Sequence, residues 1–300
     1  RVHEAATGKV SHRLAGHGAA ICQASFDATG RLLISVDQNG EWIYRSFPEG
    51  KELARVPSDL DTVFLLERLP GTGDLIAGLM DGRAARIDPV TRAVAELWPG
   101  RSLSLQDLVI SPAGRHLAVA DRRGGVRVFD LATKTWTALD RPGAESNASY
   151  GAFLASGGSF VYPDAMSNRL LAYRAPAWRV GRERIMADAA GGEFYHSLTT
   201  CAPGVCGTDD RLLAEQSSHL ELLSGTGLEV LQRFRYKAPM GSARTSERQA
   251  LVLGSKSGLL VLGPPPAGRR AVTGLGDGVI GLIHPIDART TLVGTWTGGI

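Results

Sequence analysis

The sequence has few cysteines, little imbalance of charge and no long apolar run. Only three cysteines occur in 300 residues, Cys22, Cys201 and Cys206, too few for a disulfide-stapled scaffold. No apolar run approaches the roughly 20 residues that cross a bilayer, so we expect no membrane partner. Lys and Arg total 33 and Asp and Glu total 30, and this balance argues against nucleic acid as a partner.

Sequence motifs of catalysis and cofactor binding are also lacking. No nucleophile elbow is present, and the glycine-rich segments 71–75 and 274–278 are not followed by a helical pattern that would bind phosphate. Near Cys201 and Cys206 no further Cys or His completes a zinc site, and no Cys-x-x-Cys-His motif is present to attach haem. We therefore expect no catalytic residues, no metal and no cofactor.

Helical periodicity is nearly absent, whereas short runs rich in Val, Ile, Leu, Phe and Tyr recur between Gly, Pro, Asp and Asn. The segment from Leu105 to Leu139 illustrates the unit. It predicts a four-stranded antiparallel meander with strands at 105–110, 116–120, 126–130 and 135–139.

The unit repeats along the chain with a period of about 40 to 45 residues, which is typical of β-propeller blades. The residues that precede each second strand mark the repeat: Gly30, Gly73, Gly114, Gly158, Asp210, Arg248 and Arg289. Joining the two chain ends restores the same period. The sequence therefore predicts a single all-β domain over 1–300, a seven-bladed propeller closed by both chain ends, with the seventh blade shared between 279–300 and 1–14.

The third strands carry a family resemblance. They include GEWIYRSFPEGK (40–51) and GGVRVFDLATK (124–134), and LAGHG (14–18) supplies a Gly-His pair. In this the chain resembles the WD-repeat family, in which a His, a Ser or Thr, an Asp and a strand Trp form hydrogen bonds within a blade. Here Ser35 and Asp37 are placed to meet His17. The Trp position, however, holds His3, Arg45, Ile87, Phe129 and Tyr173.

Cys201 and Cys206 flank a four-residue tip, CAPGVC, between two expected strands. They are read either as free thiols, which fits a cytoplasmic protein, or as a disulfide, which fits a periplasmic or secreted one. A metal site is the third reading, and it lacks two ligands.

The WD-repeat resemblance implies a non-catalytic scaffold or sensor domain that binds protein partners, as part of a larger protein or assembly. The loops between blades and the turns between second and third strands share one face of such a propeller. Exposed Arg, Tyr and Trp often anchor interfaces. The predicted partner-binding residues on this face are Arg101, Arg122, Arg123, Tyr236, Lys237 and Trp296.

A second hypothesis stays open. An extracytoplasmic propeller enzyme or cofactor-binding propeller would bind a small molecule in its central channel. His196 and His284 lie near the first strands of two different blades, which line such a channel.

Overall fold

The computed structural model describes most of the chain through residue 235 and the strands beyond it. From residue 234 on, only the backbone is described. The described ranges are 2–4, 10–57, 60–98, 105–121, 125–139, 151–164, 169–185, 195, 197–201, 210–216, 219–235, 240–245, 251–255, 258–262, 269–272, 280–285 and 290–295.

Every regular element in these ranges is a β-strand, and every sheet consists of four antiparallel strands. We call each sheet formed by four consecutive strands a blade. Blade 1 comprises β3 (Ile21–Phe26), β4 (Leu32–Asp37), β5 (Glu41–Ser46) and β6 (Glu52–Pro57). Blade 2 comprises β7 (Val63–Arg68), β8 (Leu75–Leu79), β9 (Ala84–Ile87) and β10 (Val94–Trp98). Blade 3 comprises β11 (Leu105–Ile110), β12 (His116–Asp121), β13 (Val126–Asp130) and β14 (Thr135–Ala138).

Blades 4 and 5 continue the same order. Blade 4 comprises β15 (Ala152–Phe153), β16 (Ser159–Asp164), β17 (Arg169–Arg174) and β18 (Arg179–Ile185). Blade 5 comprises β19 (Ser197–Cys201), β20 (Arg211–Glu215), β21 (His219–Ser224) and β22 (Val230–Arg235). The predicted meander at 105–139 is confirmed in blade 3, to within one residue at each strand end.

Two further sheets are described by their backbone pairing. One comprises β23 (Met240–Thr245), β24 (Leu251–Ser255), β25 (Gly258–Leu262) and β26 (Arg269–Val272). The other, which we call the terminal sheet, comprises β27 (Ile280–Pro285), β28 (Thr290–Thr295), β1 (Val2–Glu4) and β2 (Val10–His12). In the terminal sheet β1 pairs antiparallel with β28, and Val2 lies opposite Leu292. Arg1 and Ile300 lie outside the described residues.

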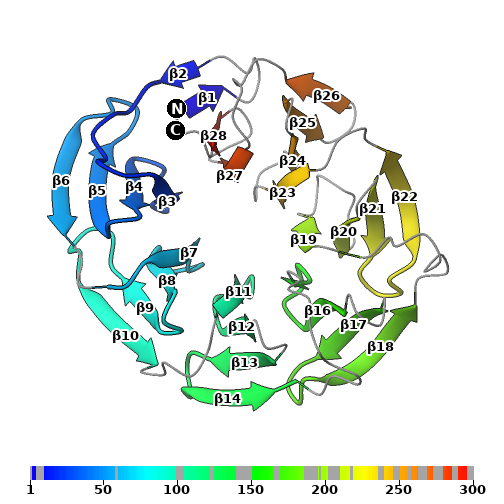
Figure 1. The fold of residues 1–300 in the computed structure, drawn as a ribbon. Coiled ribbons are helices and arrows are strands. Elements are labelled where there is room, and N and C mark those ends of the chain that lie inside the picture. The colour runs from blue at the N-terminus through cyan, green and yellow to red at the C-terminus, as the bar shows by residue number, and fades with distance from the viewer. Residues whose placement is uncertain are drawn as a thin grey trace.

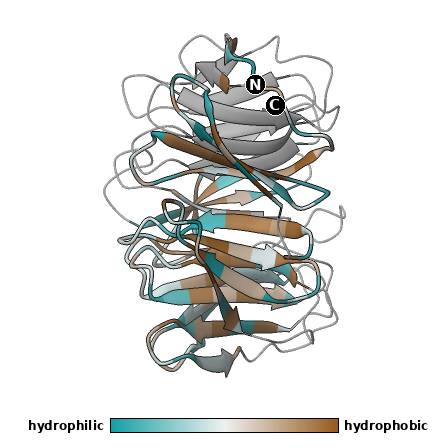
Figure 2. Cartoon of the chain, turned by 90° about the vertical axis from the view of Figure 1, so that its left-hand side faces the viewer, coloured by the Kyte–Doolittle hydropathy of each residue, from teal (hydrophilic) through white to brown (hydrophobic). Residues whose placement is uncertain are grey.

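The sheets are arranged like the sectors of a disc around a common centre, which is the architecture of a β-propeller (Figure 1). The first strand of each sheet is innermost, and the fourth forms the rim. Hydrophobic residues follow the strands and hydrophilic ones collect at the turns (Figure 2). The described residues contain no helix long and apolar enough to cross a bilayer.

Apolar packing between neighbouring blades forms the core. Trp42 and Tyr44 of β5 pack with Leu66 and Leu75 of blade 2, and all four side chains are buried. Burying an aromatic or large aliphatic side chain of this kind stabilises a fold by about 1.5 to 3 kcal/mol. Hydrogen bonds add to the apolar contact at these interfaces. The Gln23 side chain of blade 1 donates to the carbonyl oxygen of Phe64 in blade 2 at 2.7 Å.

The turns between first and second strands share a left-handed glycine. Its φ is +70° at Gly30, +79° at Gly73, +68° at Gly114 and +72° at Gly157. In blade 4 the repeat therefore falls on Gly157, one residue before the Gly158 that the sequence pattern suggested. The pattern missed this because Gly158 takes the place that Arg31 and Arg115 hold in blades 1 and 3.

The turns between third and fourth strands also repeat one geometry. Asp88 and Asp130 each accept two backbone N–H groups of their own turn through Oδ1. Each turn ends on a left-handed residue, which is Gly50 in blade 1 but Arg92 and Lys134 in blades 2 and 3. Local polar caps of this kind are why Asp and Ser recur at the ends of third strands.

Candidate functional site

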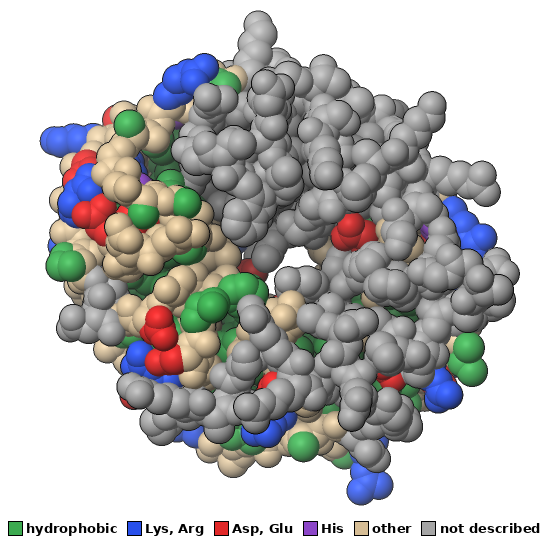
Figure 3. All heavy atoms as spheres, viewed as in Figure 1, with side chains coloured by type: hydrophobic (Ala, Val, Ile, Leu, Met, Phe, Trp, Pro, Cys, Tyr) green, Lys and Arg blue, Asp and Glu red, His purple; other side chains and the backbone are tan. Residues whose placement is uncertain are grey.

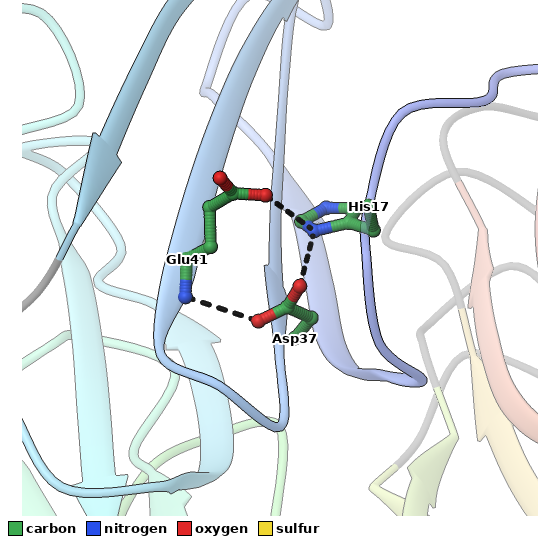
Figure 4. Close-up of side chains that lie close together, drawn as sticks. All are labelled: His17, Asp37 and Glu41. Atoms are coloured by element: carbon green, nitrogen blue, oxygen red, sulfur yellow. Dashed lines mark hydrogen bonds and ion pairs between the residues drawn. The ribbon is translucent and has the colours of Figure 1, made fainter.

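A polar network joins the Gly-His loop of blade 1 to its second and third strands. His17 lies in the loop before β3, Ser35 and Asp37 lie on β4, and Glu41 begins β5. The ring of His17 places Nδ1 3.1 Å from Asp37 Oδ2 (Figure 4). Its Nε2 lies 2.8 Å from Ser35 Oγ. The sequence-based expectation that Ser35 and Asp37 meet His17 is confirmed.

The partners fix the tautomer of the ring. A carboxylate can only accept, so Nδ1–H donates to Asp37, and Nε2 of the neutral ring then accepts from the Ser35 hydroxyl. Burial lowers the pKa of His17 below its ordinary value, although the hydrogen bond to Asp37 acts in the opposite direction. Asp37 also accepts the backbone N–H groups of Asn39 and Glu41, so its buried carboxylate is well satisfied.

Arg45 occupies the position at which the WD-repeat resemblance would place a tryptophan. It is buried, and its Nη2 donates to the carbonyl oxygen of Ala15 at 2.6 Å. Arg55 of β6 donates to the carbonyl oxygen of Gly16 at 2.9 Å and pairs with Glu41 and Glu52. Two guanidinium groups thus hold the Gly-His loop through its backbone carbonyl oxygens.

Gly16 is favoured by its backbone conformation, since its φ is +126°. A Cβ would also lie 2.9 Å from Arg45 Nη2 and 3.0 Å from Arg55 Nη2. In the Gly-His pair, the glycine therefore allows the backbone conformation of the loop and the histidine forms the hydrogen bonds.

His17, Asp37 and Glu41 bring three ligand atoms within 4.8 Å of one another, a spacing that could hold a cation. Coordination by Nδ1 would require the proton to leave the side of the ring that faces Asp37. A cation would also compete with Arg55 for Glu41. The contacts of these groups therefore favour a hydrogen-bonded clamp over a metal site.

Blade 5 contains a second polar network, which the sequence analysis missed. Glu221 of β21 is 1% exposed, and its Oε2 accepts from the Tyr195 hydroxyl at 2.8 Å. Its Oε1 accepts from Arg233 Nε at 2.7 Å, and His219 Nε2 lies 3.4 Å away. Burial by itself would raise the pKa of Glu221, but the bonds from Tyr195 and Arg233 outweigh it and the pKa is lowered. A lone Glu within the apolar run HLELLS was the one signal of this network.

The predicted partner-binding residues Arg101, Arg122, Arg123, Tyr236, Lys237 and Trp296 all lie outside the described residues, as do Cys206 and His196. His284 lies on β27 opposite Leu292, and only its backbone is described. Cys201, at the end of β19, is disulfide-bonded, whereas Cys22 is a free thiol.

The polar networks of the described residues thus position loops. The architecture is that of a β-propeller. The chain is similar to the β-propeller domain of Cps50 (Swd1) from Myceliophteria thermophila, with a TM-score of 0.62 and 14% sequence identity over 83% of this chain and 84% of that one. No family model matches the sequence, and no curated protein matches it. At this identity the likeness establishes the propeller fold.

Proposed function

We propose that the protein is a non-catalytic propeller that binds protein partners, as a scaffold or sensor domain. The His17 network carries this proposal. Its polar groups hold the loop before β3 and the turn at 37–41 rigidly on one face, so their hydrogen bonding is used for positioning. A rigid face of pre-ordered loops favours binding because little conformational entropy is lost when a partner docks. The fold likeness to a propeller domain supports the same reading.

We further propose that the ring has seven blades and is closed by both chain ends. The pairing of β1 with β28 supports this closure, as do the contacts of β27 with both β23 and β3. A ring closed in this way leaves no blade interface open to solvent.

On the face of the 37–41 turn, we propose that Arg101, Arg122, Arg123, Tyr236, Lys237 and Trp296 contact the partner. The test is affinity capture from an extract of the source cells, with the immobilised domain as bait. The variant Arg122→Ala/Arg123→Ala/Tyr236→Ala should lose specific captured proteins while its thermal unfolding is unchanged.

The matched control for this capture is Arg31→Ala/Arg127→Ala, which removes two exposed arginines elsewhere on the ring. The control should retain the proteins that the wild type captures. Identical capture by the triple variant and the wild type would refute the assignment of this face.

We also propose a Cys201–Cys206 bridge and, with it, an oxidising compartment. The disulfide at Cys201 supports it. Alkylation of protein from its native source, with and without reductant, followed by mass spectrometry tests the pairing. Modification of both cysteines without reductant would instead favour a cytoplasmic location.

A further inference from the structure

The outer part of blade 4 carries an unusual set of arginines on one side of its sheet. Leu170 and Ala172 of β17 pack with Leu198 and Leu212 of blade 5, whereas Leu171 packs with blade 3. Alternation along β17 therefore places Arg174 on the side facing blade 5 as well.

The neighbouring strand β18 extends this side. Residues directly opposite each other in an antiparallel pair share a face of the sheet. The opposed pairs are Leu170 with Arg184, Ala172 with Arg182, and Arg174 with Arg179. Arg184 confirms the direction, since its Nη1 donates to the carbonyl oxygen of Leu228 in blade 5.

Blade 5 adds a fifth arginine from the other side. Leu223 and Val230 pack in the cluster shared with blade 4, and Glu221 lies on the same face of β21 as Leu223. Arg233 is opposite Glu221 in the register, so it faces blade 4. We call Arg174, Arg179, Arg182, Arg184 and Arg233 the arginine seam. Lys and Arg side chains are visible on the rim beside blades 4 and 5 (Figure 3).

The charge of the seam is poorly balanced among the described residues. Glu221 is buried and bonded to Arg233 and Tyr195, so it balances Arg233 and none of the exposed arginines of β17 and β18. Glu183 lies on the opposite face of β18 and pairs with Arg169, and Glu229 bonds to Ser224 in its own turn. Arg174, Arg179 and Arg182 are exposed, and the buried Nε of Arg184 has no acceptor within the described part of the chain.

Arg174 and Arg179 also lie directly opposite each other across two strands. Like charges in that position destabilise a sheet. An anion that lies between them would remove the repulsion.

Strand β18 is also the edge of its sheet. Among the described strands it pairs with β17 alone, and with 7 residues it is the longest of them. The backbone N–H and C=O groups on the outer edge of such a strand can pair with an added extended segment.

We propose that the arginine seam binds an acidic protein segment in an extended conformation, added to the edge of β18 as a further strand. Residues that alternate along such a segment are about 6.6 Å apart, the spacing of Arg184 and Arg182 on one face of β18. Arg179 returns to that face three residues before Arg182, because the pairing of β17 with β18 shifts register between them. Acidic residues at every second position would therefore face the arginines. The unpaired backbone edge favours a peptide over nucleic acid, which offers no matching row of donors and acceptors.

The arginine seam shares no residue with the partner-binding face proposed above. The two proposals rest on different residues, so one can fail while the other holds.

The test uses fluorescence anisotropy with a labelled peptide of alternating Glu and Thr, about eight residues long to match β18. A peptide of the same composition with the Glu residues in one block and an oligothymidylate are the comparison probes, all at physiological ionic strength. The alternating peptide should bind more tightly than either. Equal binding of the two peptides, or tighter binding of the oligothymidylate, would overturn the proposal.

The variant Arg179→Glu/Arg182→Glu reverses two exposed charges of the seam. It should weaken binding of the alternating peptide at least about tenfold, whereas the control Arg31→Glu/Arg127→Glu should change it by less than about twofold, because distant exposed charges are screened. An equal loss in both variants would show a non-specific charge effect and would contradict the proposal.

Two further readouts separate binding from structure. Arg179→Glu should raise the Tm of the free protein, because it replaces the repulsion from Arg174 by attraction. Two peptides N-methylated at complementary alternating sets of amides should differ. One should lose binding and the other should retain it, because only one edge of the peptide pairs with β18. A fall in Tm would contradict the repulsion between Arg174 and Arg179, and equal binding of both methylated peptides would contradict strand addition.

Discussion

Gly114 of blade 3 lies so close to the carbonyl oxygen of Pro70 in blade 2 that a Cβ on Gly114 would stand 2.7 Å from it. At the two neighbouring interfaces a Cβ on Gly73 would stand 3.1 Å from the Ala28 side chain, and a Cβ on Gly157 would stand 3.9 Å from Pro112, an ordinary van der Waals distance. In blades 2, 3 and 4 the turn between first and second strands therefore contacts the corresponding turn of the preceding blade, most closely in blade 3.

Gly114→Ala should lower the free energy of unfolding by about 2 to 4 kcal/mol, because it combines left-handed backbone strain with a clash against backbone. The matched control is Gly71→Ala, where φ is +85° but a Cβ would meet no atom within 4 Å. It should cost only the strain, about 1 to 2 kcal/mol. Urea unfolding of both variants measures the difference. Equal losses in the free energy of unfolding would show that contact between the turns of neighbouring blades does not contribute to stability.

Lys134 and Gly50 each end the turn between the third and fourth strands of their blade in a left-handed conformation, with φ of 56° and 68°. Lys134→Gly should raise the free energy of unfolding by about 0.5 to 1 kcal/mol, because relief of side-chain strain exceeds the entropy cost of glycine. Gly50→Ala should lower it by about 1 to 3 kcal/mol, because its Cβ would also meet Leu14. Shifts of the same sign in the two variants would contradict the equivalence of the turns.

Stability should depend on pH through His17. Burial lowers the pKa of its ring, so the unfolded chain takes up a proton at higher pH than the folded protein does. The contribution of His17 is therefore fully present above the ordinary histidine pKa of about 6.5 and declines as the pH falls below it. Burial also lowers the pKa of His116, which acts in the same direction.

The measurement is urea unfolding of the wild type and His17→Gln between about pH 7.5 and 5.5. The glutamine variant should lose less stability than the wild type as the pH falls, because one of the two buried rings is gone. Parallel pH profiles would show that His17 is not a source of the dependence.

The sequence was sufficient to predict the strands of blade 3 and the period of the repeat, because propeller blades repeat period-two strands between turn residues that have their own local signals. Ser35 and Asp37 could be linked to His17 because the family resemblance names those positions. The contacts of Arg45 and Arg55 with the Gly-His loop could not be predicted, because long side chains reach across several strands and the spacing of residues does not encode that reach. Glu221 and the arginine seam depend on which face of a strand meets which blade, a property of the assembled ring.

We proposed that the two chain ends complete one closed ring. Cysteines at His3 and Thr291, which lie opposite each other on β1 and β28, test this proposal most directly in a variant whose native cysteines are replaced by serine. Oxidation followed by protease digestion and mass spectrometry should yield one peptide pair that joins residues 3 and 291. The control with cysteines at His3 and Thr295 should form far less of its bridge, because Thr295 pairs with Ile280 at the other end of β28. Absence of the 3–291 bridge, or equal yields from both variants, would contradict the closed ring.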